Sequence, residues 1–232
     1  MNSSTQTNQQ DVAVENHSRS RILIFGDSWP FGAELDLTKE KPYGTLIAEY
    51  MNWPMSNYSK PATSIDHLPL QLLTAQSKEL SLKGCKALFT LTSPSRSMYY
   101  EDNEYKEIHL NNGDVISKNY YAYQWSNEME KYKINLVMLS LQTMCKTLGI
   151  KDYYVCGLEP MDFIYPGIDL SKIYDEGRSS LTMLLGVARE TPIREFYQIK
   201  PNEYIWPNTN NHPNQQGHQL IAEKLQSWIA NC

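Results

Sequence analysis

The sequence predicts an α/β fold in which a mainly parallel β-sheet is covered by helices on both faces. Three observations support this prediction. Short apolar runs typical of buried strands recur along the chain, stretches with helical periodicity alternate with them, and no repeat or linker divides the 232 residues. A chain that alternates strands and helices places its strands in parallel, because each helix carries the chain back across the sheet in a right-handed crossover. A chain of this length can bury a sizeable core.

We expect a single domain over residues 21–232, preceded by a tail over residues 1–20. The tail is polar and rich in Asn, Gln and Ser, a composition typical of disordered segments. It lacks the apolar centre of a signal peptide, and no apolar run in the chain approaches the roughly 20 residues of a membrane span. We therefore expect a cytoplasmic protein that does not bind membranes.

Four segments have the composition of buried strands. The clearest are residues 21–26, which contain Ile-Leu-Ile-Phe, and residues 86–92, which contain Ala-Leu-Phe-Thr-Leu. Residues 151–157 have the same character, and a shorter candidate spans residues 54–58. The order of these strands along the chain leaves room for a helix between each pair.

Helical spacing of apolar residues marks the segments between and after the strands. Pro42 and Pro213 each suit the first turn of a helix, Pro69 is expected to kink or delay one, and Gly149 is typical of a helix C-terminus. The stretch 158–200 is expected to be irregular with short helices. The longer predicted helices cover residues 43–51, 64–82, 126–149 and 213–230.

Residues 97–125 form an insertion with an unusual number of aromatic side chains. The turn signal Asn-Asn-Gly-Asp at residues 111–114 lies between strand-like runs at 105–110 and 115–118, so we expect a β-hairpin there. Aromatic faces can stack on sugar rings or cover acyl chains; equally, they can pack the hairpin on the domain or form an oligomer contact. The aromatic residues are Tyr99, Tyr100, Tyr105, Tyr120, Tyr121, Tyr123 and Trp125.

Composition narrows the class of ligand. The formal net charge is −5, which argues against a nonspecific nucleic-acid binder. The four cysteines contain no C-x-x-C pair and do not cluster with histidines at ligand spacing, so we expect free thiols and no zinc site. They are Cys85, Cys145, Cys156 and Cys232.

Ser28 is the first candidate for chemistry. It follows the first predicted strand within Gly26-Asp27-Ser28, which places it at the carboxyl edge of the sheet, where open α/β sheets bind ligands. A serine hydroxyl becomes a nucleophile when a base takes its proton. The alternative is a simple turn, since all three residues favour turns.

His212 is the candidate base. With Pro213 in the first helical turn, it would lie at or beside the N-cap, where the helix dipole disfavours the imidazolium form and leaves a neutral ring that can accept a proton. The alternative is a capping or surface histidine. His218 lies farther along the same helix, and we expect it to be packed or half-exposed.

Together, Phe25-Gly26-Asp27-Ser28 and the motif His-Pro-Asn-x-x-Gly-His at residues 212–218 resemble the SGNH (GDSL-type) hydrolase family. The resemblance covers most of the chain, from about residue 21 to the end. It implies a three-layer α/β/α sandwich, similar to flavodoxin, with about five parallel strands. It also implies hydrolysis of esters or acyl groups without a metal or other cofactor, with Ser28 as nucleophile and His212 as general base.

The remaining family positions differ from the usual pattern. Ala62 occupies the place of a glycine whose amide contributes to the oxyanion hole together with the amide of Ser28. An asparagine that usually donates to the oxyanion is replaced within the run Thr-Ser-Pro-Ser-Arg at residues 92–96, where Ser93, Ser95 or Arg96 can donate instead. A guanidinium offers several charge-assisted donors, which favours Arg96; its alternative role is a structural ion pair or a solvated arginine.

The orienting aspartate of the family, three residues before the histidine, is replaced by Thr209. The nearest acidic residue upstream is Glu203. The resemblance therefore leaves a Ser28–His212 dyad that a backbone carbonyl, Thr209 or Asn208 would orient.

Two functions fit these residues. The preferred one is a serine esterase or carbohydrate O-deacetylase acting on a small-molecule or carbohydrate ester; the alternative is a weakly active or inactive relative that keeps the fold for glycan binding or assembly. Residues 26–35 read Gly-Asp-Ser-Trp-Pro-x-Gly-x-Glu-Leu, which resembles forms of the family in phage and bacterial sequences. Modification of a surface polysaccharide would agree with that origin. The sequence leaves the oligomeric state open.

Overall fold

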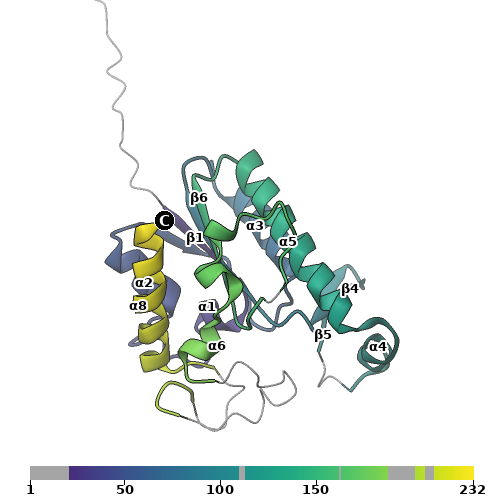
Figure 1. Ribbon diagram of the computed structural model, residues 1–232. Coiled ribbons are helices and arrows are strands. Elements are labelled where there is room, and N and C mark those ends of the chain that lie inside the picture. Colours follow the sequence, from purple (N-terminus) through teal and green to yellow (C-terminus); the bar gives the residue numbers. More distant parts are fainter. Residues whose placement is uncertain (1–20, 110–112, 162, 188–201, 207–211) are drawn as a thin grey trace, which may run out of the picture.

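Four strands form one parallel sheet in the spatial order β2-β1-β3-β6. The computed structural model describes residues 21–109, 113–161, 163–187, 202–206 and 212–232 (Figure 1). The expected mainly parallel sheet is confirmed, and each of the four predicted strand segments contributes one strand. The resemblance implied about five strands; the described residues contribute four, namely β1 (Ile22–Phe25), β2 (Met55–Asn57), β3 (Lys86–Leu91) and β6 (Asp152–Gly157).

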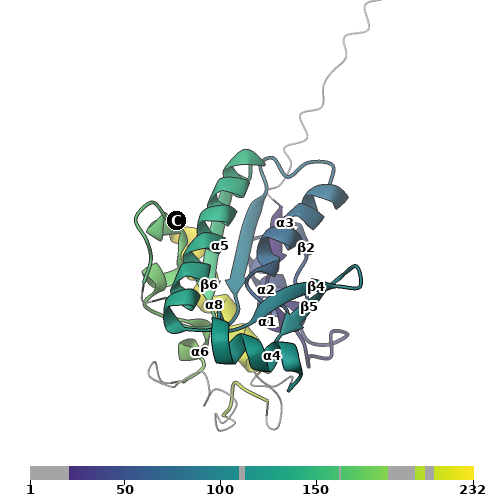
Figure 2. The same cartoon turned by 90° about the vertical axis from the view of Figure 1, so that its right-hand side faces the viewer.

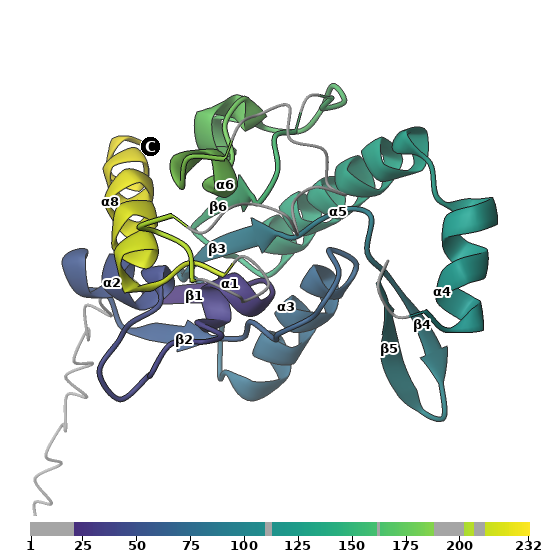
Figure 3. The ribbon, with the colours of Figure 1, turned by 90° about the horizontal axis from the view of Figure 1, so that it is seen from below.

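Alternation along β1 explains why the sheet has a helical layer on each side. Leu23 and Phe25 point into one core, which α3 (His67–Lys78) and α5 (Asn127–Thr147) cover. Ile22 and Ile24 point into the other core, beneath α2 (Tyr43–Tyr50), α8 (Gln215–Asn231) and the short α6 (Leu181–Leu184). All four residues of β1 are fully buried. Figures 1 and 3 show α2 and α8 side by side on one flank of the sheet and α3 and α5 on the other.

Side-chain caps mark the first turns of α5 and α8. Ser126 Oγ accepts a hydrogen bond from Met129 N at the start of α5, and Asn214 Oδ1 accepts one from Gly217 N at the start of α8. The prediction that Pro213 lies in the first helical turn is wrong, because Asn214 is the cap. Pro69 does not kink α3, since it lies in the first turn, where its missing N–H costs no intrahelical bond.

The hairpin in the aromatic insertion forms earlier than predicted. Its strands are β4 (Ser97–Glu101) and β5 (Glu104–Ile108), joined by Asp102 and Asn103, which both have positive φ as a tight two-residue turn requires. The predicted second strand at 115–118 is wrong: these residues lie in α4 (Val115–Asn119). The reason is Asp114, whose side chain accepts from Ser117 N at 2.8 Å and caps that helix. The predicted turn at 111–114 falls largely outside the described residues.

The segment after β6 is irregular, as expected, over residues 158–161 and 163–187, while the rest of the predicted stretch lies outside the described residues. It contains the 3₁₀ turns η2 (Leu170–Lys172) and η3 (Tyr174–Gly177) before α6. A π-helical turn, η1 (Tyr120–Gln124), follows α4. Figure 2 shows α4 beside the hairpin of β4 and β5. The four cysteines are free thiols, of which Cys232 is exposed and the others buried. Across the described ranges, no helix combines the length and the apolar character that crossing a membrane demands.

Two neighbouring leucines of α3 test which face of this helix contributes to the core. Leu72 is completely buried, whereas Leu73 is 49% exposed. Leu72→Ala should lower the free energy of unfolding by about 2–5 kcal/mol because it removes buried methyl groups and leaves a cavity. Leu73→Ala should change it by less than about 0.5 kcal/mol. Urea unfolding of both variants measures the difference, and equal losses would contradict this packing.

Candidate active site

The structure places Ser28 and His212 in hydrogen-bonding contact. Ser28 Oγ lies 2.8 Å from His212 Nε2, and both side chains are buried. Ser28 is the first residue of the short helix α1 (Ser28–Phe31), directly beyond the carboxyl end of β1. When Nε2 is unprotonated, the serine hydroxyl donates to it. This is the geometry that a base needs to take the hydroxyl proton.

Hydrogen bonds around Gly26 hold the turn that presents Ser28. Gly26 N donates to Gln71 Oε1 at 2.9 Å, and Gln71 Nε2 donates to Gly26 O at 2.8 Å. Lys60 N also donates to Gly26 O. A Cβ on residue 26 would lie 2.6 Å from Pro30 Cγ, so the close approach requires glycine. The side-chain amide of α3 thus completes the hydrogen bonding of the backbone where β1 ends.

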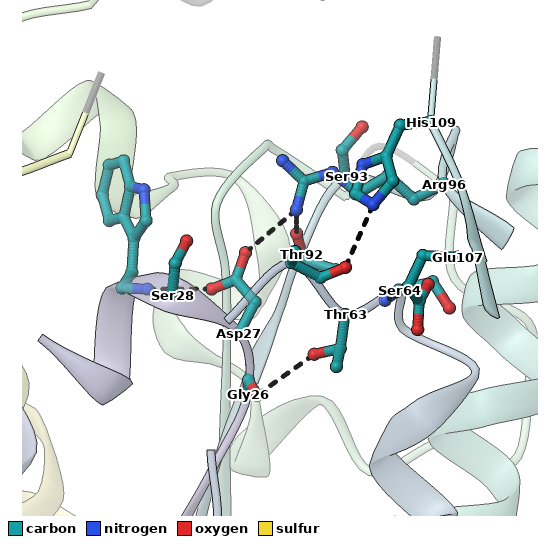
Figure 4. A network of polar contacts seen from close by, with 12 residues as sticks. Gly26, Asp27, Ser28, Thr63, Ser64, Thr92, Ser93, Arg96, Glu107 and His109 are labelled. Atoms are coloured by element: carbon teal, nitrogen blue, oxygen red, sulfur yellow. Dashed lines mark hydrogen bonds and ion pairs between the residues drawn. The ribbon is translucent and has the colours of Figure 1, made fainter. Parts of the chain in front are cut away.

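Asp27 connects the turn that presents Ser28 to Arg96. It is 1% exposed, its Oδ1 accepts from Trp29 N as the cap of α1, and its Oδ2 lies 3.5 Å from Arg96 Nη1. Arg96 Nη1 also approaches Thr92 Oγ1 at 3.3 Å. Figure 4 shows Asp27 between Ser28 and Arg96. A buried carboxylate therefore draws the guanidinium toward the carboxyl edge of β1 and β3.

A short antiparallel pairing positions His212. Trp206 N donates to His212 O, and Asn214 N donates to Tyr204 O, so residues on both sides of Pro213 pair with 204–206. This pairing replaces the helical environment that we expected, since α8 begins only at Gln215. The backbone of His212 is therefore held by a β-bridge. Thr209 and Asn208, the predicted orienting residues, lie outside the described residues.

Glu34 is a carboxylate near His212 that the sequence did not reveal. Its Oε1 lies 3.4 Å from His212 Nδ1, on the side of the ring away from Ser28. Glu34 follows Ser28 by only six positions, in the turn after α1, whereas the family pattern places the acid just before the histidine. Only the pairing of the N-terminal and C-terminal parts of the chain brings these two side chains together.

Opposing effects act on His212. Burial has the largest effect and lowers the pKa of His212. The charges of Glu34 and Asp27 raise this pKa, and the charge of Arg96 lowers it. Together these effects hold the pKa of His212 below its usual value. A neutral imidazole at neutral pH is the form that can accept a proton. His218, fully buried in α8, has its pKa lowered to about 3 by burial, and its Nδ1 accepts from Tyr43 N, which is a packing role.

The predicted oxyanion donors have distinct environments. Ala62 adopts a left-handed conformation with φ 62°, the region that favours the glycine found in the family pattern. Its carbonyl oxygen lies 3.1 Å from His109 Nε2. Arg96 Nε is buried and has no hydrogen-bond partner among the described residues. A buried guanidinium N–H without a partner can donate to a ligand, which agrees with the predicted role and leaves the role itself a prediction.

The aromatic insertion docks against the loop that carries Ala62. Glu107 Oε2 accepts from Ser64 N at 3.0 Å, and Figure 4 shows these two residues side by side. Glu107 Oε1 lies 2.5 Å from His67 Nδ1. The aromatic side chains divide into two sets. Tyr120 is buried, and Tyr121 donates to Ser95 O. Tyr100, Tyr105 and Tyr123 are exposed.

No family model matches this sequence, and no curated protein matches it. Among solved structures, it is similar to a member of the lipolytic protein G-D-S-L family from Veillonella parvula, with 14% identity over 92% of this chain and 100% of that one, and a TM-score of 0.50. Two further similar structures score below 0.5. The esterase EstA from Pseudoalteromonas sp. has 14% identity over 91% and 97% of the two chains, with a TM-score of 0.46. The acetyl xylan esterase Est2A from Butyrivibrio proteoclasticus has 15% identity over 92% of this chain and 64% of that one, with a TM-score of 0.49.

At these identities the likeness concerns the fold. The expected SGNH-type α/β architecture is confirmed by the first of these structures, which this chain resembles over nearly its whole length. No group of three or more His, Cys, Asp or Glu side chains within the described part of the chain is arranged to hold a metal ion. The fold and site define an α/β protein, similar in fold to a lipolytic G-D-S-L protein, in which Ser28 and His212 are in contact at the carboxyl edge of the sheet.

Replacing Gln71 tests how far the turn that presents Ser28 depends on the hydrogen bonds between the Gln71 side chain and the Gly26 backbone. Gln71→Ala leaves the buried Gly26 N–H without its partner, which should cost about 1–3 kcal/mol of unfolding free energy. Gln76→Ala on the exposed side of the same helix is the matched control and should be nearly neutral. Denaturant unfolding measures both. Equal unfolding free energies for the two variants would contradict a stabilising role for the bonds between Gln71 and Gly26.

Proposed function

We propose that this protein is a serine hydrolase that cleaves ester bonds, with Ser28 as nucleophile and His212 as general base. The observation that carries the proposal is the 2.8 Å contact between Ser28 Oγ and His212 Nε2 at the carboxyl edge of a parallel sheet. The lowered pKa of His212 also supports it, because the ring is neutral and ready to accept a proton at neutral pH. The fold, shared with a lipolytic protein, agrees with this chemistry.

The reaction follows from the positions of these groups. Ser28 Oγ attacks the ester carbonyl carbon while His212 Nε2 takes the hydroxyl proton, and the tetrahedral intermediate carries the negative charge on its oxygen. The amides of Ser28 and Ala62, with Arg96, supply donors for that oxygen. His212 then donates its proton to the leaving alcohol, and a water molecule activated by the same ring releases the acid from Ser28.

A carbohydrate ester is the substrate class that the exposed tyrosines favour. Tyr100 and Tyr105 stand on the hairpin with ring centroids 5.1 Å apart, and both are exposed. Aromatic faces of this kind stack on sugar rings. The same tyrosines serve the alternative function, a glycan-binding module without turnover, for which binding would survive Ser28→Ala and His212→Ala.

Labelling and turnover separate the two functions. We expect the wild-type protein to hydrolyse 4-nitrophenyl acetate and to react with a fluorophosphonate probe at Ser28. Ser28→Ala should abolish labelling and lower kcat by at least about 10³-fold, as removal of a nucleophile does in other serine hydrolases. Ser140→Ala, at a half-buried serine of α5 whose hydroxyl donates to Leu136 O, is the control and should react like the wild type. A wild-type protein that neither turns over aryl or sugar acetates nor labels at Ser28 would refute the hydrolase.

A further inference from the structure

We propose that Glu34 positions His212, so that a carboxylate from the turn after the nucleophile takes the place of the aspartate usually found just before the histidine. The proposal rests on the function proposed above. It concerns a residue that the sequence pattern did not assign, and it completes an acid–imidazole–hydroxyl array. Glu34 would accept a hydrogen bond from Nδ1 and thereby keep Nε2 free to face Ser28 Oγ.

The first support is the surroundings of the imidazole ring. Nε2 lies 2.8 Å from Ser28 Oγ, and Nδ1 lies 3.4 Å from Glu34 Oε1. Nδ1 is buried and, at this geometry, lacks a hydrogen-bond partner among the described residues. A buried N–H without a partner is unfavourable, and catalytic hydrogen bonds are often long before substrate binds. A small rotation of the Glu34 side chain would satisfy Nδ1.

The second support is how the chain delivers Glu34 to this position. Gly32 ends α1 in the left-handed conformation, and Ala33 N donates to Ser28 O at 3.0 Å, which ties the turn to the nucleophile itself. Glu34 also has a left-handed backbone, with φ 74°. A glycine would adopt that conformation with less strain, so position 34 carries a side chain where the backbone conformation disfavours one.

The third support is at the far end of the loop that carries Glu34, which spans residues 33–41 between α1 and α2. Lys41 N donates to Gln215 Oε1 at 2.7 Å, which fastens the loop to the first residue of α8, three positions beyond His212. Between the two anchors, Asp36 N donates to Glu40 Oε2. The loop is therefore tied both to Ser28 and to the segment that carries His212, and Glu34 lies between these anchors.

Asp27 is the other carboxylate that acts on His212, and it is already engaged. Its Oδ1 accepts from Trp29 N, and its Oδ2 faces Arg96 Nη1. The charged or titratable groups that act on His212 are Glu34, Asp27 and Arg96, and His212 in turn acts on His218. Among these groups, Glu34 is the one whose carboxylate lies within ion-pair distance of Nδ1.

The direct test is an NMR titration of the His212 ring in the full chain. Glu34 raises the pKa of His212, so Glu34→Gln should lower that pKa further, while Glu34→Asp should leave it between the wild-type and Glu34→Gln values. Glu40→Gln removes one charge from the same loop and should leave the pKa unchanged. An identical His212 pKa in wild type and Glu34→Gln would overturn the proposal, whether or not the protein turns over ester.

The kinetic test uses the same variants. Glu34→Gln should lower kcat by about 10²- to 10⁴-fold, as loss of the orienting carboxylate does in serine hydrolases, with KM changed less than about twofold. Because activity requires neutral His212, a lower pKa should move the acid limb of the pH profile of kcat/KM to lower pH. Glu34→Asp should recover part of the rate, and Glu40→Gln should match the wild type.

The two tests keep the proposals distinguishable. A shifted His212 pKa in a chain without esterase activity supports the contact between Glu34 and His212 and counts against the hydrolase. Esterase activity that is lost in Ser28→Ala but unchanged in Glu34→Gln supports the hydrolase and overturns the role of Glu34.

Discussion

The hydrogen bonds of Gly26 are the constraint on which the site depends. Gln71 from α3 and Lys60 from the loop after β2 both bond to this backbone, and a side chain there would collide with Pro30. The turn that presents Ser28 at the end of β1 is therefore held from two sides. The other groups of the site come from the segment between β3 and β4, from the C-terminal segment and from the loop after α1.

Burial and the neighbouring carboxylates act in opposite directions on the pKa of His212. Removal of His212 from water lowers its pKa and keeps the ring neutral, whereas Glu34 and Asp27 stabilise the charged ring that forms when it accepts a proton. Asp27 also pairs with Arg96, whose positive charge lowers the pKa of His212. A ring that is neutral at rest and stabilised once protonated suits the proposed role of His212 as a general base.

The aromatic insertion is both a structural support and an exposed surface. Glu107 and His109 connect the hairpin to the loop around Ala62, so the insertion helps hold that backbone in a left-handed conformation. Tyr100 and Tyr105, farther along the hairpin, remain exposed. Tyr105 also packs edge-on against His67 of α3, so the hairpin contacts the domain through one of its partly exposed tyrosines.

Apolar periodicity was enough to predict the four strands of the sheet and the presence of the long helices, because it is written within short stretches of chain. The pairing of Ser28 with His212 was predicted from two motifs taken together and from the resemblance that they carry, and it joins residues 184 positions apart. The predictions misplaced the hairpin turn and the start of α8, where the side chains of Asp114 and Asn214 cap helices that propensity alone does not locate. Only the tertiary structure brought Glu34 to His212 and Arg96 to Asp27. These contacts join segments far apart in the chain, and their distances depend on how the loops are anchored to the sheet rather than on any spacing in the sequence.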